Sequence, residues 1–176
     1  MKIIYLHGYG SSGTGEKQNM LIKRFGAEHV VSPDLPIEPS KVVELVNGIV
    51  RQTKDFPVIF VGTSLGGFWA NYFGQIWDAP VVIVNPSINP SKSLQKLGLA
   101  KEIAMQYKPY ENKMEKYQHN HALTNLFLAK DDDVLPYENA LQAYPQTAFT
   151  QISDTGGHRY IEQWDSVMNQ IESIVK

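Results

Sequence analysis

The chain has 176 residues, of which 43% are hydrophobic and 19% are charged, a size and composition typical of one globular domain. Its 16 basic and 18 acidic residues give a formal net charge of −2, so no overall positive field directs it toward nucleic acid or an anionic membrane. The chain has no cysteine, which excludes disulfides, thiolate metal sites and a cysteine nucleophile.

Short runs rich in β-branched residues alternate with longer amphipathic stretches, a pattern typical of a parallel sheet covered by helices. The runs at 58–61 and 81–84 are apolar throughout, as expected for central strands buried on both faces. Helical periodicity is clearest over 42–50 and 161–175. The predicted strands are 2–7, 29–32, 57–62, 80–85, 124–130 and 147–152.

The segment 87–121 is polar, rich in tyrosine and less regular than the rest. We expect a single domain over residues 1–176, with 87–121 forming a small cap within a long crossover. Tyr107, Tyr110 and Tyr117 either line an acyl pocket or pack inside the protein, and the sequence leaves both alternatives open.

A nucleophile motif follows the third predicted strand. Gly62-Thr63-Ser64-Leu65-Gly66 has the pattern G-x-S-x-G, lies after a buried-type strand and opens an apolar helix. The glycines allow a sharp turn that a side chain would crowd, and this turn lifts the serine hydroxyl above the edge of the sheet. We therefore predict that Ser64 is a nucleophile.

A serine nucleophile needs a base, and His158, in the loop after the last predicted strand, suits this role. Gly156 and Gly157 let its loop bend toward the edge that carries Ser64. An aspartate that orients the imidazole is expected within the run 131–133, where the other two carboxylates form a solvated turn. The order serine, aspartate, histidine is that of α/β-hydrolases.

The loop after the first predicted strand begins with His7-Gly8-Tyr9, a type of sequence that supplies one donor to an oxyanion hole. We assign the two donors to the backbone N–H groups of Tyr9 and Leu65.

Two rival kinds of site are disfavoured. Residues 10–15 have the glycine spacing of a phosphate-binding loop, but Glu16 occupies the position of the required lysine and Lys17 comes one residue late. His119 and His121 could chelate a metal, but no third ligand is suitably spaced. We therefore expect neither a nucleotide, nor a metal, nor any other cofactor.

Five motifs occur in order over nearly the whole chain: Tyr5-Leu6-His7-Gly8-Tyr9-x-Ser11-Ser12, Gly62-Thr63-Ser64-Leu65-Gly66-Gly67, Val84-Asn85-Pro86, Asp132-x-Val134-Leu135-x-Tyr137 and Gly156-Gly157-His158. As a set they resemble those of the YqiA-type small bacterial esterases of the α/β-hydrolase superfamily. The resemblance implies a three-layer α/β-hydrolase fold: a mostly parallel sheet of about six strands, helices on both faces and a minimal cap.

The resemblance also implies a carboxylic ester hydrolase with Ser64 as nucleophile, Asp132 as acid and His158 as base, and we expect Gly8 and Asn85 to contact the substrate. The chain differs from the family pattern at Asp131, where the family has glycine. It differs again at Gly157, which is followed directly by His158, so that this loop is one residue shorter.

The predicted function is hydrolysis of small acyl esters with short or medium chains through an acyl-serine intermediate. Two alternatives stay open: a thioesterase or amidase that uses the same residues, and a hydrolase-fold protein that binds a ligand without turning it over, for which the shorter histidine loop is the argument. The longest apolar run near Met1 has four residues, and no stretch approaches the roughly 18 of a membrane span. We therefore expect a cytoplasmic protein without a signal peptide. The sequence indicates no particular oligomeric state.

Overall fold

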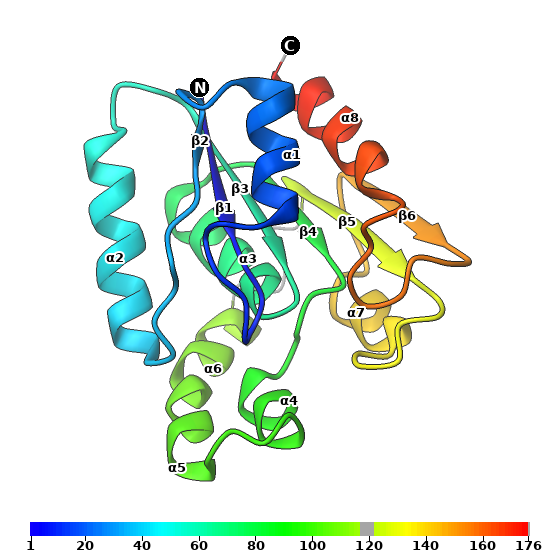
Figure 1. The fold of residues 1–176 in the computed structure, drawn as a ribbon. Coiled ribbons are helices and arrows are strands. Elements are labelled where there is room, and N and C mark those ends of the chain that lie inside the picture. Colours follow the sequence, from blue (N-terminus) through cyan, green and yellow to red (C-terminus); the bar gives the residue numbers. More distant parts are fainter. Residues whose placement is uncertain (117–121, 176) are drawn as a thin grey trace.

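One parallel sheet forms the centre of the protein (Figure 1). The computed structural model describes residues 1–116 and 122–175, and within them six strands pair in the order β2-β1-β3-β4-β5-β6. All five pairings are parallel. The strands are β1 (Lys2–Leu6), β2 (Val30–Val31), β3 (Val58–Thr63), β4 (Val81–Val84), β5 (Thr124–Ala129) and β6 (Phe149–Ser153).

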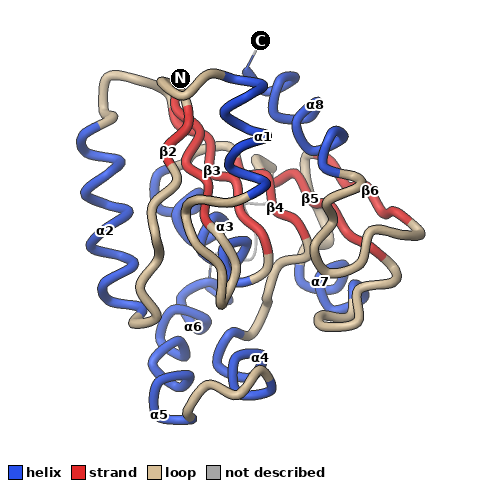
Figure 2. The backbone as a smooth tube through the Cα atoms, viewed as in Figure 1, coloured by secondary structure: helices blue, strands red, loops and turns tan. Residues whose placement is uncertain are grey.

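Helices cover both faces of this sheet, as the tube in Figure 2 shows. Two separate hydrophobic clusters define the layers. One cluster lies between the sheet and the helices α2, α3 and α7, and the other lies between the sheet and α1 and α8. These helices are α1 (Glu16–Phe25), α2 (Pro39–Gln52), α3 (Leu65–Trp77), α7 (Tyr137–Ala143) and α8 (Trp164–Val175).

The local sequence explains where α2 begins and which way it faces. Pro39 occupies the first turn, where its missing N–H costs nothing. Val42, Val46 and Val50 recur every four residues, are buried and form the stripe that packs on the sheet. β4 lies under helices on both faces, which explains why all four of its residues are apolar and buried.

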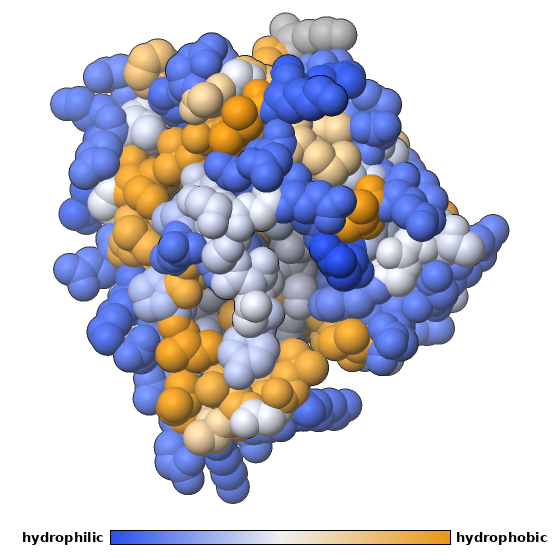
Figure 3. Space-filling view, viewed as in Figure 1, coloured by the Kyte–Doolittle hydropathy of each residue, from blue (hydrophilic) through white to orange (hydrophobic). Residues whose placement is uncertain are grey.

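Residues 87–116 lie beyond the carboxyl ends of the strands (Figure 1) and contain α4 (Pro90–Lys96), α5 (Lys101–Ala104), η1 (Met105–Tyr107) and α6 (Lys108–Lys116). The buried carboxylate of Glu111 ties α6 to α4, because it accepts hydrogen bonds from Ser91 N (2.6 Å) and Ser91 Oγ (2.9 Å). Lys108 Nζ lies 3.1 Å from the same carboxylate. In Figure 3 apolar side chains gather over this lower part of the molecule, where Leu97 and Met105 are exposed.

The two tyrosines of this segment that the structure describes pack inside the protein. Tyr107 is fully buried, lies against Trp69 with ring centroids 5.7 Å apart, and donates its hydroxyl hydrogen to Ile37 O (2.8 Å). Tyr110 packs on the same indole at 5.4 Å. Of the two alternatives left open by the sequence, the structure therefore supports packing for these two residues. Tyr117 lies outside the described residues.

Candidate active site

Ser64 lies in a sharp turn between β3 and α3. Its backbone angles, φ 55° and ψ −121°, are unfavourable for a residue with a side chain, and such strain is typical of functional sites. The close approach of the chain explains the flanking glycines. A Cβ atom at Gly66 would lie 1.9 Å from Leu6 O, and one at Gly62 would lie 2.1 Å from Gly66 O. The tight turn thus presents Ser64 at the carboxyl edge of the sheet.

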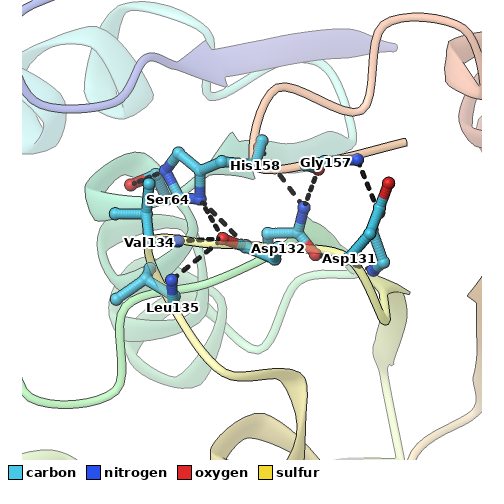
Figure 4. Close-up of polar contacts among 9 residues, drawn as sticks. Ser64, Asp131, Asp132, Val134, Leu135, Gly157 and His158 are labelled. Carbon is cyan, nitrogen blue, oxygen red and sulfur yellow. Dashed lines mark hydrogen bonds and ion pairs between the residues drawn. The ribbon is translucent and has the colours of Figure 1, made fainter. Parts of the chain in front are cut away.

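His158 and Asp132 reach Ser64 from two other loops at the same edge, after β6 and β5 (Figure 4). His158 Nε2 lies 3.0 Å from Ser64 Oγ. On the other side of the ring, Nδ1 lies 2.9 Å from Asp132 Oδ2 and 3.0 Å from Oδ1. The side chain of Asp132 is fully buried, whereas that of His158 is 22% exposed. The shorter histidine loop therefore does not carry the imidazole away from the serine.

The hydrogen bonds determine which histidine nitrogen carries the proton. An ionised carboxylate can only accept, so His158 Nδ1 must donate to Asp132. In a neutral imidazole Nε2 is then an acceptor, and the hydroxyl of Ser64 donates to it. The arrangement can therefore remove a proton from Ser64 while Asp132 stabilises the resulting imidazolium.

The three adjacent aspartates have different surroundings. Asp132 Oδ1 also accepts hydrogen bonds from Val134 N and Leu135 N, both at 2.9 Å, which hold its carboxylate under the imidazole. Asp131 is exposed, yet it accepts from Gly157 N (2.8 Å) and Gly156 N (3.3 Å), so it fixes the turn that leads into His158. Sequence reasoning expected only a solvated turn here. Asp133 is exposed.

Asn85, expected from the sequence to contact the substrate, lies behind the histidine loop. It is 2% exposed, and both ends of its side-chain amide are engaged within the protein. Nδ2 donates to the carbonyls of Gly157 (3.0 Å) and His158 (3.3 Å), and Oδ1 accepts from Ala129 N (3.0 Å). The side chain therefore connects the ends of β4 and β5 to the histidine loop, and we interpret it as a residue that positions His158.

The loop after β1 lies directly beside the serine. A Cβ atom at Gly8 would approach Ser64 Cβ to 3.2 Å and Oγ to 3.7 Å. His7, whose role the sequence did not indicate, is buried and holds this loop: Nε2 accepts from Leu35 N (2.9 Å), and Nδ1 donates to Gly8 O (2.8 Å). Leu65 is the first residue of α3, and its N–H has no acceptor within the helix. The predicted oxyanion donors thus lie on the two segments that flank Ser64.

Ser64 and His158 open into a pocket of about 190 Å³. Gly8 and Tyr9 form one side of it, and Lys17 and Arg159 belong to its lining as well. A larger pocket of about 580 Å³ is lined by residues of α4 and α7, together with Val134 and Leu135.

His119 and His121, considered above as metal ligands, lie outside the described residues. Within 1–116 and 122–175 no group of three or more histidine, aspartate or glutamate side chains is arranged to hold a metal ion. In the same residues no helix has the length and apolar character needed to cross a membrane.

The sheet order, the two helical layers and the turn at Ser64 define the class of this protein, the α/β-hydrolase fold, as predicted. Solved structures agree. Est1E from Butyrivibrio proteoclasticus superposes with a TM-score of 0.74 at 15% identity, over 99% of this chain and 88% of the other. The monoacylglycerol lipase of Paleococcus ferrophilus gives a TM-score of 0.72 at 14% identity, over 94% of this chain and 91% of the other.

Within that class, residues 2–176 match the model of the uncharacterised protein family UPF0227, and the chain belongs to this family. The resemblance inferred from the sequence motifs is thereby confirmed. A UPF0227 protein of Pectobacterium carotovorum is 31% identical over 97 residues, which are 52% of this chain and 54% of the relative. This alignment therefore spans about half the length of that relative.

Proposed function

We propose that the protein is a serine hydrolase that cleaves carboxylic esters with short or medium acyl chains through an acyl-serine intermediate. The observation that carries the proposal is the unbroken hydrogen-bonded series from Asp132 through His158 to Ser64, which ends at a strained serine inside a pocket. These distances support Ser64 as nucleophile, His158 as base and Asp132 as orienting acid.

In the first half of the reaction Ser64 Oγ attacks the ester carbonyl carbon and gives its proton to His158 Nε2. The carbonyl oxygen becomes an oxyanion, to which the backbone N–H groups of Tyr9 and Leu65 donate. Each such donor is worth about 3–4 kcal/mol of transition-state stabilisation. When the bond between the carbonyl carbon and the alkoxy oxygen breaks, His158 returns the proton to the leaving alcohol.

In the second half water attacks the acyl-serine and gives a proton to His158 Nε2. The carboxylic acid departs as the proton returns to Ser64 Oγ, and the enzyme is restored. Throughout, Asp132 keeps Nδ1 protonated and Nε2 directed at the serine, while Asp131 and Asn85 fix the loop behind the ring.

The size of the pocket supports short or medium acyl chains. Its volume of about 190 Å³ is below the roughly 300–1,000 Å³ of sites that enclose drug-sized ligands. Residues 87–116 stand beyond the strand ends (Figure 1), which supports a single domain in which this segment forms the small cap.

The test is hydrolysis of p-nitrophenyl acetate and butyrate by the wild type, by Ser64→Ala and by Ser40→Ala. Ser40 is an exposed serine of α2, remote from the pocket, and serves as the matched control. We expect the wild type and Ser40→Ala to turn over these esters and to be labelled by a fluorophosphonate. Ser64→Ala should show neither turnover above background nor labelling.

Labelling without hydrolysis of these esters, together with turnover of acyl-thioesters or amides, would retain the serine mechanism and replace the substrate class. If the folded wild type showed no labelling and no turnover, the proposal would be refuted. That result would favour a protein that binds a ligand without reaction.

A further inference from the structure

Lys17, in the first turn of α1, lines the same pocket as Ser64 and His158. Its ammonium group lies 5.1 Å from the centre of the Trp164 ring. This indole is fully buried and packs edge-on against Tyr5, which also lines the pocket. The Lys17 side chain therefore lies against aromatic rings, and its ammonium group is held at the pocket.

The nearest carboxylate is engaged elsewhere. Glu16 Oε2 lies 3.2 Å from Arg159 Nη2, and this pair sits at the exposed rim of the pocket. In the part of the chain that the structure describes, no carboxylate lies within ion-pair distance of Lys17 Nζ. Glu16 pairs with Arg159, and Asp132 is bonded to His158, so among the described charged groups at the site Lys17 is the cation without a carboxylate partner.

Lys17 is partly buried, which makes this cation unfavourable. Desolvation, followed by the charge of Arg159, lowers the pKa of Lys17 to about 8, although Glu16 acts in the opposite direction. A buried charge is normally matched by a counter-ion, because the free energy of desolvation is otherwise uncompensated. An anionic group that enters the pocket would supply this counter-ion.

We propose that the substrates of this site carry a carboxylate a few bonds from the scissile ester, and that Lys17 selects them by pairing with it. The inference rests on the proposed function for its chemistry, since the ester must be cleaved at Ser64. One carboxylate suits the single unpaired ammonium group, and the small volume suits a short dicarboxylic acyl group or a compact acidic alcohol.

The test compares pairs of related esters that differ in charge. On the acyl side, p-nitrophenyl hydrogen succinate is compared with p-nitrophenyl butyrate. On the alcohol side, 4-carboxyphenyl butyrate is compared with 4-carbamoylphenyl butyrate. The variant is Lys17→Met, which keeps an apolar stem over Trp164, and the control is Lys23→Met, an exposed lysine of the same helix.

We expect the wild type and Lys23→Met to prefer the anionic member of at least one pair. In Lys17→Met this preference, as a ratio of kcat/KM values, should fall about 10- to 100-fold, the range for a hydrogen bond to a charged group. The neutral esters are measured in the same variant, so the ratio separates lost pairing with the carboxylate from a general loss of activity. The pair that shows the effect identifies the end of the substrate that carries the carboxylate.

A binding measurement separates failure of this inference from failure of the proposed function. Succinate is titrated calorimetrically into Ser64→Ala and into Ser64→Ala with Lys17→Met, after a thermal melt has shown that both fold. Binding that requires Lys17, without ester hydrolysis by the wild type, would retain the carboxylate site and reject the hydrolase. Ester hydrolysis with equal preference in wild type and Lys17→Met, and succinate binding independent of Lys17, would overturn the inference and leave the hydrolase intact.

Discussion

Replacement of Asn85 by alanine isolates the contribution of the contacts behind His158. The substitution leaves Ala129 N–H without its acceptor in a buried position, at a cost of about 1–3 kcal/mol. The Nδ2 group serves two carbonyls of a half-buried loop, which water can partly rehydrate, and its loss costs about 1 kcal/mol more. The free energy of unfolding should therefore fall by about 2–4 kcal/mol, which lowers Tm by about 5–15 °C in a chain of this length.

The backbone at Asn85 provides a second variant. Its φ of 43° lies in the left-handed region, which asparagine tolerates, alanine disfavours and glycine adopts freely. Asn85→Gly removes the same hydrogen bonds without the backbone strain, so it should be more stable than Asn85→Ala by about 1 kcal/mol.

The assay combines thermal unfolding with kinetics on p-nitrophenyl butyrate. A looser histidine loop should lower kcat more than it raises KM, because the imidazole acts in the transition state and does not bind the ester. Asn112→Ala, at an exposed position of α6, is the control and should change stability by less than about 0.5 kcal/mol. If Asn85→Ala matched Asn112→Ala in both Tm and kcat, the positioning role assigned to Asn85 would be refuted.

Three further predictions concern the serine, the acid and the pocket lysine. Asp132→Asn should lower kcat on p-nitrophenyl butyrate about 10,000-fold. The control is Asp133→Asn, at the exposed neighbouring position, and comparable losses in the two variants would contradict the role assigned to the Asp132–His158 contact. Ser64→Gly should be more stable to unfolding than Ser64→Ala by about 1 kcal/mol, and should therefore melt at a higher temperature, since glycine adopts φ 55° without strain. The reverse order of the two melting temperatures would show that the turn is relaxed. The preference for hydrogen succinate over butyrate should be constant between about pH 6 and 7, where the substrate carboxylate is ionised, and decline above pH 8, where Lys17, with a pKa of about 8, loses its charge. Burial raises the pKa of Tyr5, and His158 acts on both esters alike, so neither produces this change in the ratio. A ratio that stays flat to pH 10 would argue against the lysine.

The sequence predicted the sheet well because its signals are local. Strands such as β3 and β4 are continuous apolar runs, each followed by a glycine-rich or asparagine-proline turn. The motif around Ser64 is recognisable locally, but only Gly62 is required by an atom of the same turn, Gly66 O. Gly66 is required by Leu6 O of β1, a contact that the local pattern does not reveal.

The sequence could not assign the individual contacts, because these depend on segments far apart in the chain. Among three adjacent aspartates, Asp132 turns inward since the N–H groups of Val134 and Leu135 and the ring of His158 surround it. The role of Asn85 depends on atoms 44 and 73 positions away. In the sequence Lys17 stands out only beside an imperfect phosphate-binding pattern. The neighbouring residues reveal neither its contact with Trp164 nor the lack of a paired carboxylate among the described residues.

The position of β6 gives the site a particular sensitivity to denaturation. Within the described part of the chain, this strand lies at the edge of the sheet and pairs only with β5. Its residues alternate between exposed and half-buried, unlike those of the fully buried β4 and β5. Such edges open with a smaller free energy than the core. His158 follows β6, so fraying of this edge would withdraw the base while Ser64 and the inner strands remain folded. Activity should therefore disappear at a lower urea concentration than the far-UV circular dichroism signal, and a bound anionic ester, by bridging α1 to the serine, should bring the two transitions closer together.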